Sequence, residues 1–478
     1  MAARTRISNA DWVVAWDAAN ARHAYLAGGD VTFEGDTIAF VGRGDGGPAD
    51  TVIDGRGLMV MPGLVNVHAH PATEPFFRGI REEHGVPAMY MSGLYERSAA
   101  YFPPLEARRF AAEAAYCELL KSGVTTVLDL SAAYPGWLDL AARSGLRVVL
   151  APGYASARWR LENDWRLLYE WDEAGGRKRF DEALRLVDDA VRHPCGRLSG
   201  ALCPTQIDTC SEELLRDSAA AARARGLALT THCAQSVVEF NEMVARHGMT
   251  PVQWAAQAGV LGRGTILGHA IFLDGHSWLH WHSRDDLRLL AETGTAVGHC
   301  PTVFARYGQA LEDIGAYRRA GVAVGLGTDV APHNLIEEMR HAIMVGRVAA
   351  GEIASVSTAA VFDAATARGA DALLRPDLGR LAPGAKADLV LVDLTEPTMM
   401  PARDPLRSLV YAAADRAVRD VYVGGEKVVE SGRVLTLDHA AAAGALREAQ
   451  ARMEAEVPSR DFRGRTADDI TPPSLPRL

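Results

Sequence analysis

Short apolar runs that read as strands alternate with longer helical stretches from about residue 60 to residue 370. The strand-like runs include Gly123-Val-Thr-Thr-Val-Leu-Asp-Leu130, Leu227-Ala-Leu-Thr-Thr-His232 and Val322-Ala-Val-Gly-Leu-Gly-Thr-Asp329. The stretches between them are long enough for helices and rich in good helix formers. Sustained strand–helix alternation predicts an α/β protein with a parallel (β/α)₈ barrel of the TIM type, which we place at residues 61–377.

The two ends of the chain have a different pattern. Residues 29–42 and residues 418–430 each contain two apolar runs separated by turn residues, so each segment predicts a β-hairpin. We expect residues 1–60 and 378–440 to form one small β-sandwich together. Residues 441–478 contain a helical stretch and a Pro-rich tail, which we expect either to pack on a neighbouring subunit or to be mobile.

Composition limits the kind of protein. A chain of 478 residues with 48% hydrophobic and 23% charged residues is typical of a globular protein with more than one core. The net charge of -10 argues against a nucleic-acid partner. The six cysteines form no Cys-x-x-Cys pair, which favours reduced thiols. Because no segment has the pattern of a signal peptide or a membrane span, we expect a cytoplasmic enzyme with a small-molecule substrate.

His68 and His70 lie at the end of the strand-like run Leu58-Met-Val-Met-Pro-Gly-Leu-Val-Asn-Val-His-Ala-His70. Residues two apart on a strand point to the same side, so both imidazoles can face one metal ion. The pair by itself is equally compatible with two half-buried histidines bonded to backbone carbonyls. Further ligands at the ends of later strands would decide between these readings.

Polar residues end the later strands of the predicted barrel: His232, His269, His299 and Asp329. Functional groups of such barrels gather at the carboxyl ends of the strands, so we expect these side chains to converge with the first pair. Imidazoles with one carboxylate suit Zn²⁺ or another divalent first-row ion with an open position for water. Such an ion lowers the pKa of its water, which indicates hydrolase chemistry.

The chain resembles the amidohydrolase superfamily, in the branch of the cytosine, guanine and adenosylhomocysteine deaminases and the triazine hydrolases. The resemblance covers nearly the whole chain and rests on Met61-Pro-Gly-Leu-Val-Asn-Val-His-Ala-His70, Gly123-Val-Thr-Thr126, Thr231-His232, Gly268-His269, His299-Cys-Pro301, Gly327-Thr-Asp329 and Gly379-Arg-Leu-Ala-Pro-Gly-Ala-Lys-Ala-Asp388.

The resemblance implies a single divalent ion, with zinc expected and iron as the alternative, held by His68, His70, His232 and Asp329. The site would be mononuclear, because no lysine lies near the fourth strand, where binuclear members carry a carboxylated lysine. Asp329 would also be the general base, and His269 would contact the bound water or the substrate. A homo-oligomer is expected by the same analogy.

The departures from the family pattern bear on the substrate. Deaminases of this branch usually carry His-x-x-Glu, but here the stretch is His232-Cys-Ala-Gln235, and a glutamine does not shuttle protons. Thr205 stands where those deaminases carry a substrate-binding histidine. Glu239 is a further acid in this region, which we expect to be a solvated helix residue. His269 or Asp329 would then pass a proton to the leaving nitrogen.

We therefore expect hydrolysis of a C–N bond in a small amide, urea or carbamate-like substrate, xenobiotics such as aryl-ureas and thiocarbamates included, with Gln235 orienting the substrate. The alternatives are deamination or dehalogenation of a nitrogen heterocycle of the triazine, purine or pyrimidine type, and a non-catalytic binding protein on a degenerate barrel. The candidate substrate contacts are Thr205, His299, Phe304, Arg306 and His333.

Two further groups of residues stand out. An apolar substrate pocket is predicted from His84, Met89, Tyr90, Met91, Trp159, Phe304 and Tyr307. A second metal site is conceivable at His276, His280 and His282, although we expect these to be exposed loop histidines.

Overall fold

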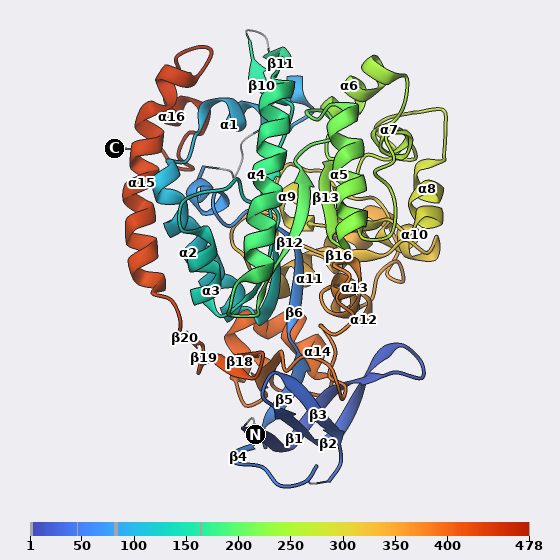
Figure 1. Cartoon of the computed structure of the whole chain (residues 1–478), viewed down its shortest axis with the longest axis vertical. Helices are drawn as coiled ribbons and strands as arrows, with labels where there is room; N and C mark the ends of the chain where they lie inside the picture. The colour runs from blue at the N-terminus through green and yellow to red at the C-terminus, as the bar shows by residue number, and fades with distance from the viewer. Residues whose placement is uncertain (1–2, 45, 81–84, 163–164, 478) are drawn as a thin grey trace.

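The barrel predicted from the alternation is present in the computed structural model, which describes residues 3–44, 46–80, 85–162 and 165–477. Its parallel strands follow one another around the barrel (Figure 1). They are β6 (Leu64–Ala69), β7 (Val124–Asp129), β8 (Arg147–Leu150), β12 (Leu198–Pro204), β13 (Ala228–Cys233), β14 (Thr265–His269), β15 (Ala296–His299) and β16 (Val324–Leu326). Almost every residue of these strands is buried, as expected where helices cover the outside and side chains fill the inside.

The barrel closes between its first and last strands at their carboxyl ends. Asp329 N donates to His68 O at 2.9 Å, and His70 N donates to Asp329 O at 3.3 Å. Asn66 strengthens this closure, since its Oδ1 accepts from His68 N at 3.1 Å and its Nδ2 donates to Thr328 Oγ1 at 2.9 Å. The closure therefore brings Asp329 directly beside His68 of β6 and His70, which follows β6.

Helices surround the barrel and its rim. They are α1 (Leu94–Ala100), α2 (Arg108–Lys121), α3 (Trp137–Ser144), α4 (Glu173–Arg192), α5 (Glu212–Arg225), α6 (Val237–His247), α7 (Pro251–Gln257), α8 (Asp286–Thr293), α9 (Pro301–Ala305), α10 (Ile314–Arg319), α11 (Leu335–Ala350), α12 (Thr358–Ala364) and α13 (Ala367–Ala372), with the 3₁₀ turns η1 (Glu74–Phe77), η2 (Pro87–Met89) and η3 (Leu105–Ala107). Side-chain caps fix several starts; Ser211 accepts from Leu214 N, and Ser236 accepts from Glu239 N.

A hairpin is inserted between β8 and β12, together with the short β9 (Gly153–Tyr154). It consists of the antiparallel strands β10 (Ala157–Leu161) and β11 (Leu167–Trp171). In Figure 1 this hairpin rises at the end of the barrel opposite to the β-domain. It therefore stands at the end where the barrel strands have their carboxyl termini.

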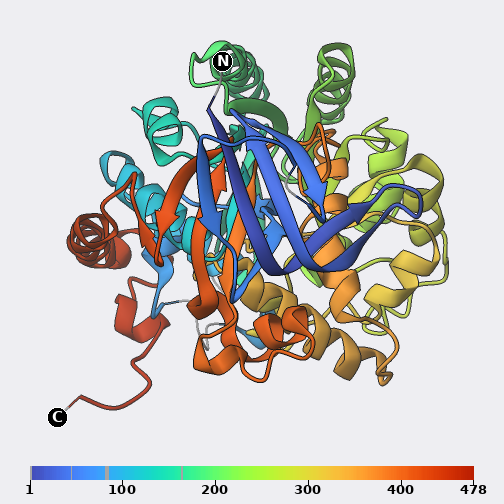
Figure 2. The same cartoon turned by 90° about the horizontal axis from the view of Figure 1, so that it is seen from below.

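Both ends of the chain contribute to one β-domain, as predicted. Figure 2 shows the amino-terminal strands and the carboxyl-terminal strands side by side across the lower face of the barrel. The strands are β1 (Arg4–Asp17), β2 (Arg22–Glu34), β3 (Thr37–Gly42), β4 (Thr51–Asp54), β5 (Leu58–Pro62), β17 (Leu389–Asp393), β18 (Val418–Val423), β19 (Glu426–Glu430) and β20 (Arg433–Val434), in one nine-stranded sheet joined where β17 pairs with β5. The short elements η5 (Pro397–Met399), α14 (Pro405–Ser408), η6 (Leu409–Ala413) and η7 (Ala414–Ala417) connect β17 to β18.

A buried ion pair fastens the β-domain to the barrel. Arg147 of β8 donates to Asp388, just before β17, through Nε at 2.8 Å and Nη2 at 3.0 Å. Both side chains are at most 5% exposed. The pair is bidentate and desolvated, so loss of one partner would leave a buried charge without compensation.

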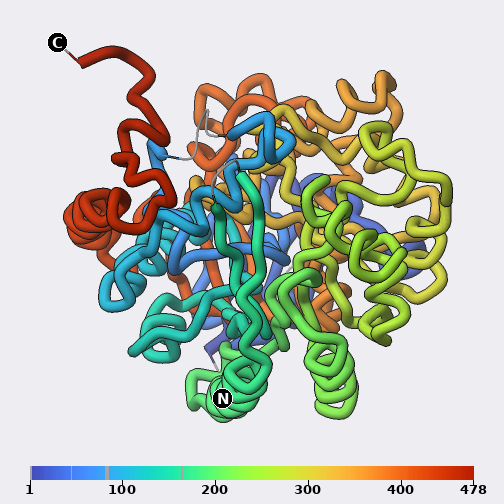
Figure 3. The backbone as a smooth tube through the Cα atoms, turned by 90° about the horizontal axis from the view of Figure 1, so that it is seen from above, coloured from blue at the N-terminus to red at the C-terminus, as the bar shows by residue number. Residues whose placement is uncertain are grey.

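Helix α15 (His439–Arg460) packs on the barrel of its own chain. Leu446, Met453 and Val457 lie in one apolar cluster with Phe76 and Phe77 of η1 and residues of α2. Figure 3 shows the segment after it, which includes α16 (Ala467–Ile470), at the rim of the molecule. Within the described ranges no helix combines the length and apolar character needed to cross a membrane.

Candidate metal centre and active-site cavity

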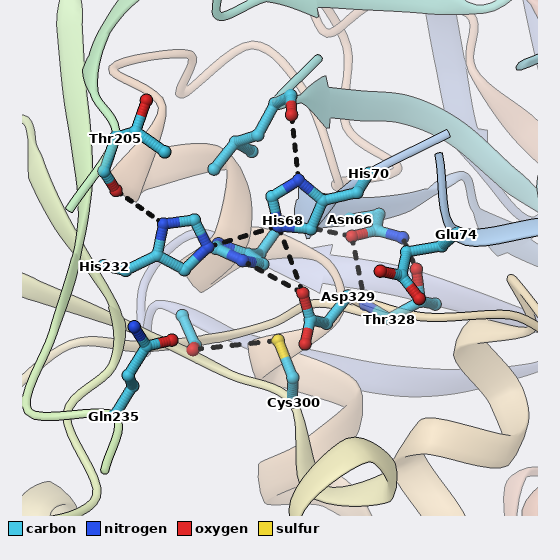
Figure 4. Close-up of polar contacts among 12 residues, drawn as sticks. Asn66, His68, His70, Glu74, Thr205, His232, Gln235, Cys300, Thr328 and Asp329 are labelled. Atoms are coloured by element: carbon cyan, nitrogen blue, oxygen red, sulfur yellow. Dashed lines mark hydrogen bonds and ion pairs between the residues drawn. The ribbon is translucent and has the colours of Figure 1, made fainter. Parts of the chain in front are cut away.

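Four side chains from three places in the barrel converge on one point. They are His68 of β6, His70 directly after β6, His232 of β13 and Asp329 after β16, and their ligand atoms all lie within 4.8 Å of one another (Figure 4). His70 Nε2 is 3.2 Å from Asp329 Oδ1, and His68 Nε2 is 3.4 Å from the same oxygen. This set is the one expected from the sequence, and three imidazoles with one carboxylate would suit a divalent ion that takes a water molecule as its fifth ligand.

The hydrogen bonds of the imidazoles suit a cation at the centre. His70 Nδ1 lies 2.8 Å from Leu130 O, and His232 Nδ1 lies 2.6 Å from Thr205 O. Because a carbonyl oxygen only accepts, both Nδ1 atoms carry hydrogens, and in the neutral form of each ring Nε2 presents its lone pair. These two Nε2 atoms face each other at 3.2 Å. Two lone pairs at this distance are stabilised by a proton or a metal ion between them, so the arrangement suits a cation at the centre.

The protonation states agree with metal binding. Burial lowers the pKa of His68, and burial with the neighbouring imidazoles holds the pKa of His232 well below its ordinary value. Burial opposes ionisation of Asp329, but its contacts with His68 and His70 keep its pKa well below the usual range. Burial likewise opposes the charged form of His70, whose pKa is nevertheless raised by Asp329. Neutral imidazoles and an ionised carboxylate are the ligating forms.

Backbone conformation and small neighbours position these groups. His269 and Asp329 have φ of 80° and 56°, in the left-handed region that non-glycine residues rarely adopt. The ring of His68 lies against Gly268, where a Cβ would be 2.8 Å from His68 Cε1. Gly327 is packed against the backbone of the same histidine. The fold therefore tolerates strain and close approach where the candidate ligands sit.

A cavity of about 330 Å³ opens over the candidate metal centre, and His70, His232 and Asp329 are part of its wall. Of the residues expected at the site, Thr205, Gln235, His269 and Phe304 line it, together with Trp159 and Tyr307. Burial lowers the pKa of His269 to about 3, so this imidazole is neutral. Phe304 packs on it at 4.7 Å between ring centroids. The cavity thus combines a metal-ligand floor with aromatic walls.

Other expected contacts lie outside the described cavity wall. His299 is buried at the end of β15. Arg306 donates to Ala331 O at 3.0 Å, and His333 is fully buried with its Nδ1 2.9 Å from Thr328 Oγ1. Each of these side chains is engaged in, or enclosed by, the scaffold around the ligands.

The predicted covering loop and the second histidine group also have definite places. Met89 is buried in a cluster with Tyr95, whereas Tyr90 and Met91 are exposed. His84 lies outside the described residues. His280 and His282 are exposed as expected, whereas His276 is buried against Phe272. In the described part of the chain these histidines form no group that could hold a metal ion.

Glu239 is not the solvated helix residue that the sequence suggested. Its side chain is fully buried, and it accepts from Ala234 N at 2.5 Å and Gln235 N at 3.2 Å. Burial and the nearby Asp208 raise its pKa to about 8. The Ser-x-x-Glu pattern formed with Ser236 was a signal for a glutamate turned back over the helix start.

Several residues of the cavity wall were missed from the sequence, among them the polar residues Glu74, Arg97 and Gln206. Glu74 and Arg97 form a buried ion pair of 3.0 Å, and they lie on η1 and α1 in a stretch with little periodic pattern. Gln206 Oε1 accepts from Gln235 Nε2 at 2.5 Å. Only its place directly after a barrel strand, next to Thr205, could have pointed to it.

The hairpin is held over the cavity by one buried carboxylate. Asp208 Oδ2 accepts from Trp159 Nε1 at 2.9 Å and from Tyr169 OH at 2.8 Å, and these two residues face each other across β10 and β11. Arg246 donates to Asp208 O at 2.6 Å. The aromatic wall at Trp159 is therefore fixed by the loop that follows β12.

Comparison with known proteins agrees with this geometry. The model of the amidohydrolase family matches residues 59–428. The 5-methylthioadenosine/S-adenosylhomocysteine deaminase of Natronomonas pharaonis is 32% identical over 90% of this chain and 94% of its own length. The 5'-deoxyadenosine deaminase of Methanothermobacter thermautotrophicus is 31% identical over 86% and 91%.

Solved structures share the fold. An adenosine deaminase from Xanthomonas campestris with bound zinc superposes with a TM-score of 0.79 at 22% identity, covering 95% of this chain and 99% of the other. A triazine hydrolase from Arthrobacter aurescens gives 0.77 at 23% identity with the same coverage. The chain belongs to the amidohydrolase family, as a metal-dependent hydrolase acting on carbon–nitrogen bonds.

Proposed function

We propose that this enzyme hydrolyses a C–N bond in a small amide, urea or carbamate-like compound, xenobiotic aryl-ureas and thiocarbamates included. One divalent ion, zinc in preference to iron, would be held by His68, His70, His232 and Asp329. When bound, the ion supplies Lewis acidity, which polarises a carbonyl group and lowers the pKa of a water molecule. The proposal includes a cytoplasmic homo-oligomer, by analogy with relatives.

One observation carries the choice of substrate: the side chain three residues after His232 is an amide. Gln235 is 5% exposed, lines the cavity and donates to Gln206. Hydrolytic deamination of an aromatic ring needs an acid that protonates a ring nitrogen and later the leaving ammonia, and a carboxamide has no proton to transfer near neutral pH. Glu239, the carboxyl nearest to Gln235 in the chain, holds the backbone behind Gln235 and is not part of the described cavity wall, whereas Glu74 in that wall is paired with Arg97 and Asp329 is a candidate metal ligand.

Cleavage of an amide, urea or carbamate makes smaller demands on proton transfer. The carbonyl carbon is already electrophilic, so a single proton delivered to the leaving nitrogen completes the reaction. Asp329 can carry that proton, because its Oδ1 faces the histidines and its Oδ2 is left to accept it from the nucleophile. Neutral His269 can donate a hydrogen bond to the developing oxyanion from the cavity wall.

The remaining wall would hold the part of the substrate that does not react. Trp159 and Phe304 present aromatic surface, which suits an aryl or alkyl group. Thr205 has a supporting role, since its hydroxyl donates to Tyr154 O at 3.1 Å and its carbonyl orients His232. We do not assign substrate contacts to His299, Arg306 or His333.

Deamination or dehalogenation of a nitrogen heterocycle is the second candidate. It is favoured by the relatives, because those at about 30% identity are deaminases of 5-methylthioadenosine, S-adenosylhomocysteine or 5'-deoxyadenosine. It requires a proton donor other than Gln235.

A substrate panel separates the two candidates. Zinc-loaded enzyme is incubated with acetanilide, N,N-dimethyl-N'-phenylurea, methyl phenylcarbamate, 5'-methylthioadenosine and a chlorotriazine, and released aniline, ammonia and chloride are measured. We expect aniline from at least one of the first three and no ammonia from the nucleoside. Ammonia or chloride release without any aniline would overturn the proposal. The Asp329→Ala variant is the blank, since it lacks both a ligand and the base.

A further inference from the structure

Two glutamines beside the metal ligands form a single polar unit, here called the amide pair, Gln206 and Gln235. Gln235 Nε2 donates to Gln206 Oε1 at 2.5 Å. The two side chains are 8% and 5% exposed, and both line the cavity above the candidate metal site. They therefore meet a ligand in a desolvated place, where an unmatched polar group is costly.

The amide pair is attached to the scaffold through a metal ligand. Gln206 pairs with His232 in a parallel β-bridge, in which His232 N donates to Thr205 O and Ile207 N donates to His232 O, both at 3.0 Å. On the other side, Gln235 is three residues after His232, and its backbone N–H donates to buried Glu239. Figure 4 shows Gln235 on the same side of the cluster as His232. The pair therefore has a fixed position relative to the reacting centre.

The bond between the two amides leaves a defined set of groups for a ligand. Once one N–H of Gln235 Nε2 is given to Gln206 Oε1, Gln235 Oε1 remains as an acceptor and Gln206 Nε2 remains as a donor, while the side chain of Gln235 also has a hydrogen bond with Glu239. If both amides were turned over, the roles would exchange and the same two kinds of group would remain. The amide pair is uncharged in either arrangement, so it offers one carbonyl oxygen and one NH₂ and no proton to transfer.

We propose that the amide pair recognises the scissile group of the substrate through hydrogen bonds and that Gln206 is a specificity-determining residue. The inference rests on the proposed function. The free glutamine oxygen accepts the N–H of the amide, urea or carbamate, and the free NH₂ donates to an oxygen of the same group. The pair thus selects neutral substrates that keep an N–H on the scissile nitrogen over fully N-alkylated ones.

A matched pair of ligands tests the inference through binding. The probes are N,N-dimethyl-N'-phenylurea, with one N–H, and N,N,N'-trimethyl-N'-phenylurea, which has none. Their Kd values are measured on zinc-loaded protein from the rapid tryptophan fluorescence change in stopped flow. We expect the first probe to bind wild type about tenfold more tightly, as one buried hydrogen bond provides. Gln206→Met, which keeps the length but not the polar atoms, should reduce the ratio to less than about twofold.

A variant of a third glutamine, Gln309, is the control for steric effects of the added methyl group. Gln309 also faces the cavity, but its Nε2 already donates to Tyr90 O at 2.8 Å. Gln309→Met should keep the tenfold ratio. Zinc content and melting temperature establish that each variant is folded. If Gln206→Met does not fold, Gln235→Met, which removes the other half of the pair, replaces it and should reduce the Kd ratio in the same way.

The outcomes separate this inference from the proposed function. A tenfold ratio that persists in folded Gln206→Met and Gln235→Met, or no ratio in wild type, overturns the role of the amide pair even if aniline is released. A ratio that depends on the pair, without release of aniline from any substrate, supports recognition by the pair and overturns the proposed reaction instead.

Discussion

Gly268→Ala should impair metal binding without dismantling the barrel. The added Cβ would lie 2.8 Å from His68 Cε1 and 3.2 Å from its Nδ1, whereas ordinary contact begins near 3.4 Å. The imidazole would have to move by about 0.6 Å, and metal–ligand distances tolerate about 0.2 Å. His68 is fully buried, so its ring has little room to turn away. We expect zinc affinity to fall about 10- to 100-fold, and overpacking to cost about 1–3 kcal/mol of unfolding free energy.

The assay is competition for zinc with a chromophoric chelator, alongside denaturant unfolding of the metal-free protein. Gly298→Ala is the matched control. It lies on the neighbouring strand β15, and its Cβ would meet its nearest atoms at 3.5 to 3.7 Å, which is ordinary contact. Wild-type zinc affinity in Gly268→Ala, or an equal loss in Gly298→Ala, would refute the argument that this glycine makes room for His68.

Further predictions concern the domain junction, pH and the hairpin. Asp388→Ala should cost about 3–5 kcal/mol of unfolding free energy because it leaves Arg147 buried and unpaired, whereas Arg288→Ala at an exposed pair should change the unfolding free energy far less, both by denaturant titration. Zinc affinity should fall as pH decreases through the raised pKa of His70, because below that pKa zinc must displace one proton from the ring, and should level off above it, where the ring is neutral; chelator competition from pH 5.5 to 8.5 measures the slope, and a pH-independent affinity would contradict it. Asp208→Ala should loosen the β10–β11 hairpin, since Trp159 and Tyr169 both donate to the carboxylate oxygen that this change removes, so KM should rise several-fold and amide hydrogen exchange across residues 157–171 should quicken while zinc affinity stays constant.

Two local features of the sequence supported much of the prediction: the alternation of apolar runs, and the residue types at the ends of those runs. Alternating apolar runs predicted the barrel, because parallel strands buried on both faces are recognisable as continuous apolar segments. His68, His70, His232, His269, His299 and Asp329 were expected at one face because each ends such a segment, and the resemblance to the amidohydrolase superfamily selected His68, His70, His232 and Asp329 among them as the ligands. Gly424 and Gly425 predicted the turn between β18 and β19 for a similarly local reason.

Features that depend on side-chain direction were harder to predict. Glu239 was expected in solvent, but the cap at Ser236 turns it back into the interior. Arg306 and His333 follow strands as substrate contacts should, yet they bind Ala331 and Thr328 in the scaffold instead. Position along the chain indicates which end of the barrel a residue occupies, and not which way its side chain points.

The sequence by itself determined the fold class, the composite β-domain and the identity of the candidate ligands, since these depend on periodicity and on residue type at strand ends. Only the tertiary structure decided that Gln206 touches Gln235 and that two imidazole lone pairs face each other across the centre. Those contacts join residues whose separation in sequence has no fixed relation to their distance in space. They depend on how the closed barrel brings its loops together.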